Sequence, residues 1–406
     1  MLTGYRVLDL TDEKGFLCGK ILGDLGADVI KVERPGGDTA RNIAPFYHDT
    51  PDPEKSLHWF AFNASKRGVT LNIEDPEGQD LFKKLSDTAD FIIESFPPGY
   101  MEKQGLGYSA LSTRNPKLIM TSITPFGQTG PYKDRKASEI VIMAMGGMTD
   151  INGDSDRPPL RLYLDQAYYL ASSYAAAGTL LALHCRYAAG KGQQVDVSIY
   201  ECVVRANYRE PIRWEYTQML TSRMGNLFAR GGRAYRQLWP CKDGYVTWLL
   251  MPDNVKPVRA FVEWMKEEGA AGRWGEMNWD EVSLLKWSPE EQDALTKAIA
   301  DFIATHTVKE LEKASIQRGL LLSPVNSVDL VAEDEQLLAR GDWKKIEHPE
   351  LGATFNYSRF TYLTSEGNNE VRFRAPLVGE HNDEIYGKEL GLSKETLTAL
   401  KQKGVL

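Results

Sequence analysis

One carboxylate stands at the start of the most apolar stretch of this chain. Asp165 is followed by Tyr168 and Tyr169, and then by a run rich in alanine and leucine that contains no proline and ends near Arg186. Alanine and leucine favour helix, so the run predicts a buried helix that begins beside Asp165. A carboxylate in this position is either an N-cap of the helix or a reactive group, and its residue type fits both roles.

Basic side chains close to predicted strand ends are candidates for binding an anion. Arg34 and Arg41 follow a predicted strand over residues 27–33, and Lys66 and Arg67 lie at a polar turn before another strand. Ligands of open α/β sheets bind at the carboxyl ends of strands, so Arg34 and Arg41 are well placed for a phosphate. Each residue taken alone is more often ordinary surface charge, and that alternative stays open.

Composition limits the class of protein. The 406 residues are 42% hydrophobic and 26% charged, with a formal net charge of -8. These values are typical of a globular chain with two domains, and they indicate no surface for nucleic acid or for an anionic membrane. No apolar run reaches membrane length and the N-terminus enters a strand directly, so we expect a cytoplasmic protein.

The cysteines point away from metal and disulfide chemistry. The chain has four of them, widely spaced, with no CxxC pair and no neighbouring histidine in a ligand pattern: Cys18, Cys185, Cys202 and Cys241. We therefore expect no metal site and reduced thiols.

The predicted elements place these residues in an α/β fold. Strands and helices alternate through the first 130 residues, with strands over 5–10, 27–33, 68–72, 89–96 and 118–124 and helices over 15–26 and 76–85. This alternation predicts a doubly wound parallel sheet, which the long helix and a strand at 195–199 extend. The G-x-G-x-x-G pattern is absent from the first turn, so a dinucleotide fingerprint is weak.

A second, smaller domain is expected in the C-terminal half. Residues 239–250 have the form of a hairpin with Asp243-Gly244 as its turn, and charged helical segments follow to about residue 317. We predict a small inserted α+β domain over 225–325 within a large α/β domain made of 1–224 and 326–406. From Leu321 onward the chain is again expected to be rich in strands.

Six ordered runs resemble the class III CoA-transferase family, which includes formyl-CoA and carnitine CoA-transferases. They are VLDLT with LGDLGADVIKVERPGGD, FNASKRGVTLN, ADFIIESFPPGYMEKQGLGY, NPKLIMTSITPFGQTGPY, LLALHCRYAAGKGQQVDVSIYE and RAPLVGEHNDEIYGKELGL. The resemblance implies a CoA-binding α/β domain, a smaller inserted domain and two subunits interlocked like chain links. It also implies transfer of CoA from an acyl-CoA to a free carboxylic acid through a mixed anhydride on an enzyme carboxylate, without a metal or a permanently bound cofactor.

The resemblance assigns roles to particular residues. Arg34, Lys66 and Lys103 match positions that contact the CoA phosphates, and Ser95 and Phe96 match positions near the adenine. Lys103 stands where a close relative has arginine, so a bidentate contact becomes a point charge.

Two further matches lie around the reactive end of CoA. Lys136 matches a position near the pantetheine arm, and Gly231 and Gly232 match a mobile glycine loop over the active site.

The expected catalytic aspartate departs from the family's spacing. In the family it lies twenty-two residues before the first glycine of a G-[KR]-G-Q motif; that glycine is Gly190 here, and the count reaches Tyr168. Asp165 lies nearly one helical turn earlier, and Ser172 replaces a glycine of the family. A tyrosine has no carboxylate and so cannot form the anhydride.

Two interpretations of this departure follow. In one, a local shift brings Asp165 to the reaction and the chain is a complete homodimeric enzyme. In the other, which we favour, the chain is the non-catalytic partner of a heteromer whose paralogous subunit carries the nucleophile. The LDQAYYLASSYAA stretch resembles the subunit that lacks the family aspartate in succinyl-CoA:benzylsuccinate CoA-transferases. That resemblance implies succinyl-CoA as donor and an acid such as benzylsuccinate as acceptor.

Two other functions stay open on the sequence. One is an acyl-CoA-binding subunit without chemistry. The other is an acyl-CoA racemase or isomerase, which needs a histidine paired with an aspartate; the sequence places only His184 near Asp165, several helical turns away. The acceptor acid cannot be read from the sequence, because Tyr168, Tyr169, Trp214 and Tyr216 fit either a pocket or the core.

Overall fold

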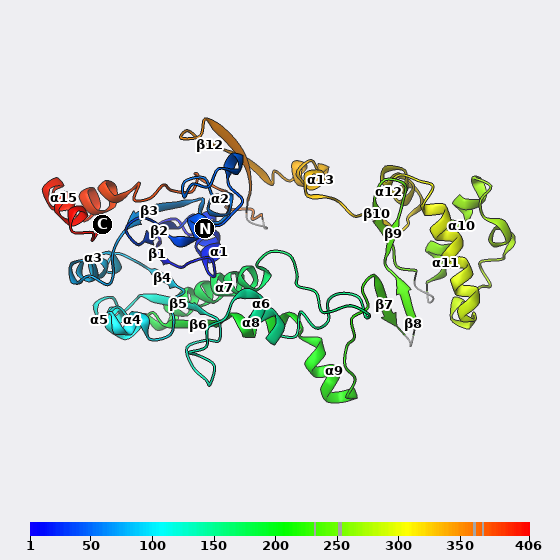
Figure 1. Ribbon diagram of the computed structural model, residues 1–406, viewed down its shortest axis with the longest axis horizontal. Coiled ribbons are helices and arrows are strands. Elements are labelled where there is room, and N and C mark those ends of the chain that lie inside the picture. Colours follow the sequence, from blue (N-terminus) through cyan, green and yellow to red (C-terminus); the bar gives the residue numbers. More distant parts are fainter. Residues whose placement is uncertain (231–232, 251–253, 360–362, 368) are drawn as a thin grey trace. The chain divides into compact units, whose positions relative to one another are not determined.

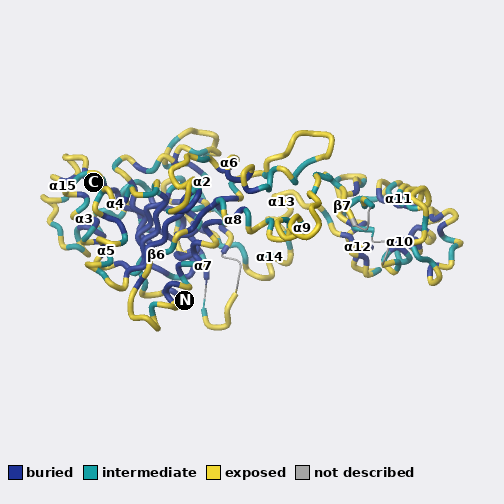
Figure 2. Tube along the Cα trace, turned by 90° about the horizontal axis from the view of Figure 1, so that it is seen from below, coloured by how far each residue is buried: buried dark blue, intermediate teal, exposed yellow. Residues whose placement is uncertain are grey.

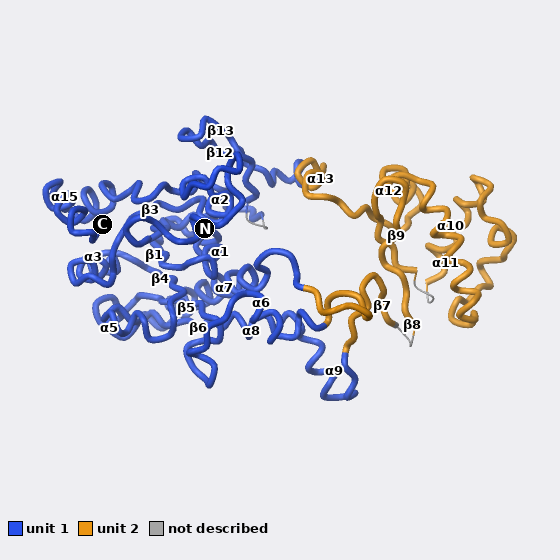
Figure 3. The backbone as a smooth tube through the Cα atoms, viewed as in Figure 1, with its two compact units in different colours: residues 1–150, 161–220, 336–406 blue, residues 151–160, 221–335 orange. Residues whose placement is uncertain are grey.

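The computed structural model describes residues 1–230, 233–250, 254–359, 363–367 and 369–406. The chain divides into two compact units (Figure 3). Unit 1 comprises residues 1–150, 161–220 and 336–406, and unit 2 comprises residues 151–160 and 221–335. Unit 2 thus contains the whole of the predicted insert, together with a short segment that precedes the long helix.

Unit 1 is built on a six-stranded sheet in the order β3-β2-β1-β4-β5-β6, with every neighbouring pair parallel (Figure 1). Its strands are β1 (Arg6–Leu10), β2 (Asp28–Glu33), β3 (Lys66–Thr70), β4 (Phe91–Glu94), β5 (Ile119–Thr124) and β6 (Gln194–Ser198). The four central strands are almost wholly buried, as expected when helices cover both faces of a parallel sheet. The predicted α/β fold with a doubly wound parallel sheet is confirmed.

Helices cover the sheet in two layers, each with its own apolar cluster (Figure 2). The first layer consists of α1 (Phe16–Asp24), α6 (Glu139–Met145), α7 (Gln166–Ala189) and α8 (Ile199–Ala206). The second consists of α3 (Pro76–Ser86), α4 (Tyr100–Lys103), α5 (Tyr108–Arg114) and α15 (Lys394–Gln402). The other helices of the unit are α2 (Leu57–Asn63) and α9 (Arg209–Thr217), with 3-10 turns at Thr39–Asn42 and Tyr47–Asp49 and a π-helix at Asp383–Glu389.

The long helix α7 packs closely against its neighbours because its buried face consists of small side chains. Ala167, Ala171 and Ala175 are all buried along it, which lets α1 and the sheet approach the helix backbone. Gly190 ends the helix in the left-handed conformation at φ 70°, where glycine has no steric cost. The G-K-G-Q motif is thus the turn that connects α7 to β6.

Two sequence predictions of local structure are wrong. Lys66 and Arg67 lie in β3 rather than at a turn, because the preceding apolar run forms α2, whose first turn is capped by Ser56. The chain after Leu321 is only partly strand: β11 (Ser323–Pro324), β12 (Trp343–His348) and β13 (Ala353–Ser358) are interrupted by α13 (Val328–Ala332) and α14 (Glu335–Ala339).

Unit 2 combines short antiparallel strands with helices around a tryptophan-rich core. Besides β11 and α13, its elements are β7 (Leu227–Arg230), β8 (Arg233–Arg236), β9 (Leu238–Pro240), β10 (Tyr245–Thr247), α10 (Val255–Glu267), α11 (Pro289–Ile303) and α12 (Val308–Arg318), with 3-10 turns at Gly272–Glu276 and Leu284–Lys286. Strands β9 and β10 pair antiparallel across Asp243-Gly244, which confirms the predicted hairpin. Among the helices of the described ranges, none is long and apolar enough to cross a bilayer.

Candidate active site

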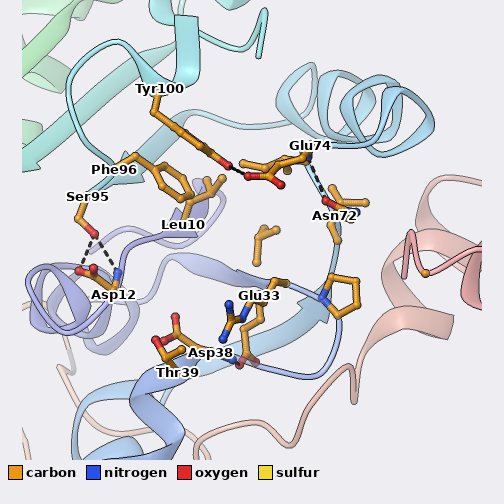
Figure 4. Close-up of a pocket in the computed structure, with 16 residues that line it drawn as sticks. Leu10, Asp12, Glu33, Asp38, Thr39, Asn72, Glu74, Ser95, Phe96 and Tyr100 are labelled. Atoms are coloured by element: carbon orange, nitrogen blue, oxygen red, sulfur yellow. Dashed lines mark hydrogen bonds between the residues drawn. The ribbon is translucent and has the colours of Figure 1, made fainter. Parts of the chain in front are cut away.

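A pocket of about 550 Å³ lies at the carboxyl ends of β1, β2, β3 and β4 (Figure 4). The strand order reverses between β1 and β4, and such a switch point is where open α/β sheets bind their ligands. Its lining consists of Leu10, Asp12, Val32, Glu33, Arg34, Pro35, Asp38, Thr39, Leu71, Asn72, Ile73, Glu74, Ser95, Phe96, Tyr100 and Gly404. Three residues predicted to bind CoA are therefore brought together here: Arg34, Ser95 and Phe96.

Glu33 and Arg34 set the charge at one end of this pocket. Glu33 is fully engaged, because it accepts from Arg41 Nε at 2.7 Å, from Arg41 Nη2 at 2.8 Å and from the Asp38 amide at 2.8 Å. An acidic residue at this strand end would bind a free ribose diol, and Glu33 is not free to do so. Arg34 donates only Nε, to the Gly37 carbonyl at 3.2 Å, so its terminal nitrogens are available for a phosphate.

Arg41 does not share that role. Its guanidinium is fully buried, and it bridges Glu33 to Glu54 with an Nη1–Oε2 distance of 2.7 Å. The sequence-based suggestion that Arg41 contacts phosphate is therefore not supported by its position.

Two stacked rings form a flat wall on the other side of the pocket. Phe96 and Tyr100 stack with ring centroids 4.5 Å apart and an interplanar angle of 25°. The Tyr100 hydroxyl donates to Glu74 Oε1 at 2.9 Å, and the Phe96 amide donates to Glu94 Oε2 at 2.8 Å. These two hydrogen bonds help to fix the positions of both rings. A flat apolar surface of this kind suits a purine base.

Ser95 supports the pocket rather than presenting a free hydroxyl. Its Oγ donates to Asp12 Oδ1 at 2.8 Å and accepts from the Asp12 amide at 2.9 Å. These two bonds tie the loop after β4 to the loop after β1, as Figure 4 shows.

Lys66 is buried in the fold and is not among the residues that line the pocket. Its fully buried ammonium donates to Asp9 Oδ2 at 2.8 Å, to the Phe16 carbonyl at 2.9 Å and to Asn63 Oδ1 at 2.9 Å. All three donors are used, so a direct phosphate contact would require one of these bonds to break. That contact stays a prediction.

Lys66 belongs to a buried cluster of charged groups at the ends of β1 and β2. Lys31 Nζ lies 3.9 Å from Asp9 Oδ1 and 3.8 Å from Asp38 Oδ2, so two ammonium groups lie among two carboxylates. Burial alone would raise the pKa of Asp9, but the charges of Lys66 and Lys31 outweigh it and hold that pKa below its usual range. The lysines of this cluster are therefore paired within the fold.

The remaining predicted CoA contacts are not gathered into the pocket. Lys103 at the end of α4 and Lys136 in the segment before α6 are both exposed, and neither pairs with a carboxylate of the described chain. Gly231 and Gly232 lie outside the described residues. Their assignments stay predictions.

Asp165 occupies the N-cap position of α7 without capping it. Its side chain makes no hydrogen bond to the helix amides; Oδ1 instead lies 3.3 Å from Arg161 Nη2. Arg161 Nε also donates to Glu139 Oε2 at 3.2 Å. Leu164, directly before it, has φ 61°, an uncommon conformation for a residue with a side chain. The Asp165 carboxylate is therefore an ion-paired group at a strained turn.

Tyr168 is the side chain that points into unit 1 at the start of α7. It is only 7% exposed. Burial raises the pKa of its phenol, and the carboxylates of Glu13, Asp12 and Asp165 raise it further, so the hydroxyl stays protonated. One turn later, Ser172 Oγ lies 3.3 Å from the Lys14 carbonyl. No carboxylate projects from α7 where the family spacing requires one.

His58 is a residue of this site that the sequence analysis missed. Burial lowers the pKa of its imidazole and the Asp165 carboxylate opposes that effect, so the two groups lie within electrostatic reach. The expectation that only His184 stands near Asp165 is therefore wrong. No motif links His58 to Asp165; only the packing of α2 beside α7 brings them together.

Aromatic rings connect these two helices. Phe62 packs on His58 with centroids 4.9 Å apart and stacks on Tyr169 at 5.2 Å. The buried Nε2 of His58 has no hydrogen-bond partner among the residues the structure describes. Within the same described ranges, no group of three or more histidine, cysteine and carboxylate side chains is arranged to hold a metal ion.

The doubly wound sheet and its switch-point pocket define an α/β protein of the open-sheet class, in which ligands bind at this edge. Residues 2–382 match CoA-transferase family III, and the chain belongs to this family. Homologues in the family are named CoA-transferases, so the chain is of an enzyme class that acts on CoA thioesters.

Similar proteins span almost the whole chain. The chain is 32% identical to the succinyl-CoA:(R)-benzylsuccinate CoA-transferase subunit BbsE of Thauera aromatica, over 94% of this chain and 92% of that protein. It is 31% identical to the succinyl-CoA–D-citramalate CoA-transferase of Chloroflexus aurantiacus, over 100% of this chain and 98% of that protein. The crystal structure of a CaiB/BaiF family protein from Brucella suis superimposes with a TM-score of 0.82 at 29% identity, covering 95% of this chain and 98% of that chain.

Proposed function

We propose that this chain is the non-catalytic subunit of a heteromeric class III CoA-transferase that moves CoA from succinyl-CoA to a free carboxylic acid. One observation carries the proposal: at the start of α7 the inward side chain is the buried phenol of Tyr168, while Asp165 is held by Arg161. A phenol cannot form the acyl anhydride that the reaction needs. The similarity to a named subunit of a benzylsuccinate CoA-transferase supports the same conclusion, and an acid of that kind is the proposed acceptor.

In the proposed reaction the paralogous subunit supplies the attacking carboxylate. Its oxygen adds to the thioester carbonyl and the C–S bond breaks. CoA leaves as a thiolate, and a mixed anhydride of the donor acid and the enzyme carboxylate remains. The thiolate then attacks the carboxyl carbon of the enzyme, releasing the donor acid and leaving an enzyme-bound CoA thioester. The acceptor acid takes CoA by the same two steps in reverse. This chain contributes a CoA pocket lined by Arg34 and Phe96 and completes the assembly.

Peptide mapping after trapping tests the proposal. The chain is co-expressed with its genomic-neighbour paralogue, and the complex is treated with succinyl-CoA and then with hydroxylamine or borohydride. We expect the label on the paralogue and no CoA transfer by this chain alone. A label on Asp165, or transfer by this chain alone, would overturn the proposal.

A complete homodimeric enzyme is the second candidate, and the position of His58 favours it. An imidazole within electrostatic reach of Asp165 could assist a carboxylate of this chain in the reaction. This candidate requires the purified chain to exchange labelled succinate with succinyl-CoA, and it requires Asp165→Asn to abolish that exchange.

His58 also allows the alternative function of a racemase or isomerase to be tested. Proton abstraction beside a thioester needs a base such as His58 or Asp165. A racemase or isomerase would exchange the α-proton of an acyl-CoA for deuterium in D₂O, and His58→Phe would stop the exchange. A CoA-transferase subunit leaves that proton in place.

A further inference from the structure

Unit 2 contains a second pocket, which the proposed CoA chemistry does not use. It has a volume of about 500 Å³ and lies between the paired strands β7 and β8 and the helix α11. Its lining consists of Leu227, Arg233, Ala234, Tyr235, Arg236, Trp239, Leu250, Pro289, Gln292, Asp293, Thr296, Lys297 and Ala300. This volume falls within the range of roughly 300–1,000 Å³ that is common for sites enclosing small organic molecules.

One face of α11 is directed at this pocket. The lining residues of the helix recur at spacings of three and four, which places them on a single stripe: Pro289, Gln292, Asp293, Thr296, Lys297 and Ala300. The opposite stripe, with Leu295, Ile299 and Phe302, is buried in the core of the unit. The pocket stripe is thus separate from the face that folds the unit, and it mixes a hydroxyl and an amide with apolar surface.

Arg236 is the group that indicates the chemistry of the ligand. It is half-buried, lies opposite Leu227 in the β7–β8 register, and has its guanidinium carbon 5.4 Å from the centre of the Trp239 ring. Its guanidinium makes no hydrogen bond or ion pair with any residue in the described part of the chain. A partly desolvated guanidinium is costly without an anionic partner, so the site is built to receive one.

The neighbouring charges leave that role to Arg236. Arg233 donates Nη2 to the Trp287 carbonyl at 3.2 Å, and Lys297 pairs with Asp301 at 2.6 Å. Asp293 is the carboxylate in the lining; it is exposed, and it forms no ion pair with Arg236. With Lys297 neutralised by Asp301, two arginines face one aspartate, so the pocket favours a monoanion.

We propose that this pocket binds a small carboxylic acid as its anion. The planar guanidinium of Arg236 matches a carboxylate through two parallel hydrogen bonds. The Thr296 hydroxyl has no hydrogen bond to a described residue and adds a donor, while Leu227, Leu250 and the Trp239 ring surround the apolar body of the acid. The site belongs to unit 2 and does not depend on which chain of the transferase carries the nucleophile.

Ligand titration of the full-length chain tests this proposal. Phenylacetate is titrated by calorimetry, and phenylacetamide, which has the same shape without the charge, is the matched ligand. We expect phenylacetate to bind and the amide to bind at least about tenfold more weakly. Arg236→Gln should weaken phenylacetate binding at least about tenfold and leave CoA binding unchanged, because the CoA pocket lies in unit 1.

A matched variant and a second pocket variant keep the test decisive. Arg259→Gln removes the same charge from an exposed ion pair with Asp280 on α10, outside the pocket, and should bind phenylacetate as the wild type does. Thr296→Val preserves volume and should weaken phenylacetate binding severalfold even if Arg236→Gln does not fold. Equal binding of acid and amide, no binding by the wild type at millimolar acid, or unchanged binding by folded Arg236→Gln would each overturn the proposal. So would loss of subunit assembly in Arg236→Gln with acid binding intact, since the guanidinium would then hold a carboxylate of a partner chain.

Discussion

Asp165 is the N-cap of α7 and Tyr168 lies three residues later in its first turn, and their side chains have different surroundings. Asp165 is about one-third exposed and pairs with Arg161, whereas the Tyr168 phenol is kept neutral by its burial and, to a smaller extent, by nearby carboxylates that raise its pKa further. Attack on a thioester needs an unpaired carboxylate shielded from water. At the scale of single residues, neither side chain is therefore an unpaired, buried carboxylate.

Asp165→Asn separates an ion-paired carboxylate from a nucleophile. We expect the rate of the assembled complex to stay within about twofold of the wild type, since loss of a nucleophile would cost several orders of magnitude. The free energy of unfolding should fall by less than about 1 kcal/mol, because the pair with Arg161 is partly exposed and screened by solvent. Steady-state CoA transfer and urea unfolding give the two values; a thousandfold loss of rate would establish Asp165 as the nucleophile.

Arg34→Gln tests the phosphate contact in the first pocket. With Glu33 occupied by Arg41, the cation beside it suits the 3′-phosphate of CoA. We expect the variant to bind CoA about tenfold more weakly and 3′-dephospho-CoA almost normally. Lys84→Gln, at an exposed position on α3 outside the pocket lining, serves as the control and should leave CoA affinity unchanged. An equal effect of Arg34→Gln on both ligands would contradict the assignment.

At the scale of elements, glycines decide how closely the helices and strands of unit 1 approach one another. The G-K-G-Q turn after α7 contains one glycine that needs its backbone conformation and one that needs space. Gly190 has φ 70° with open space around it, whereas a Cβ on Gly192 would lie 1.8 Å from the Leu118 carbonyl oxygen. The motif is therefore explained by packing of the turn on the start of β5.

The two glycines give a matched pair of variants. Gly192→Ala should destabilise the protein by several kcal/mol, because backbone and not a flexible side chain blocks the new methyl group. Gly190→Ala should cost only about 1 kcal/mol, the usual penalty for alanine in a left-handed helix cap. Thermal and urea unfolding compare them; equal effects would show that the close approach to Leu118 is not real.

Glu94, at the end of β4, makes the stability of the fold depend on pH. Burial is the main cause that raises the pKa of this carboxyl to about 7. The charges of Glu102 and Asp12 raise the pKa further, whereas hydrogen bonds from Ser122 and the Phe96 amide lower it. A folded-state pKa above the ordinary value of 4.5 means that the associated stability is present below pH 4.5 and is lost as pH rises through about 7.

Glu94→Gln should remove this dependence. The amide keeps an acceptor for the Phe96 amide but does not ionise, so the variant should gain stability over the wild type at pH 8, on the order of 3 kcal/mol. The gain should vanish near pH 4. Unfolding free energies measured from pH 4 to 8 check this, and a constant difference at all pH values would refute it.

At the scale of the whole molecule, unit 1 carries apolar surface that a single chain leaves uncovered. No residue of α9 is buried, and Trp214 and Tyr216 on it are 45% and 84% exposed. Large exposed aromatic groups of this kind mark protein–protein contacts. The feature supports the proposed assembly with a second chain, for which the resemblance suggested an interlocked form.

Trp214→Glu should therefore impair assembly with the paralogue. Placing a charge in a contact centred on an aromatic side chain removes a typical anchor and costs desolvation. We expect light scattering to show mostly free chains at concentrations where the wild type is associated. Lys84→Glu, a charge change on the exposed side of α3, should leave assembly unchanged; normal association of Trp214→Glu would exclude α9 from the interface.

Much of the fold was predictable because local patterns agree with it. Buried strands such as β1, β2 and β5 are short apolar runs between turns, and α7 is a long run of helix formers, so periodicity identifies them. Lys66 was misplaced because its charge suggested a turn, whereas burial beside Asp9 and Asn63 satisfies it inside a strand. Patterns of polarity cannot anticipate such pairing across elements.

The sequence by itself determined the α/β class, the family and the absence of a carboxylate at Tyr168, because these depend on residue order and spacing along one chain. Only the tertiary structure decided which charges are free. Lys66 and Arg41 form buried ion pairs, whereas Arg34 and Arg236 remain open to ligands. His58 lies within electrostatic reach of Asp165. The physical reason is that the availability of a side chain depends on partners contributed by distant elements, and those partners meet only when the sheet and its helices pack.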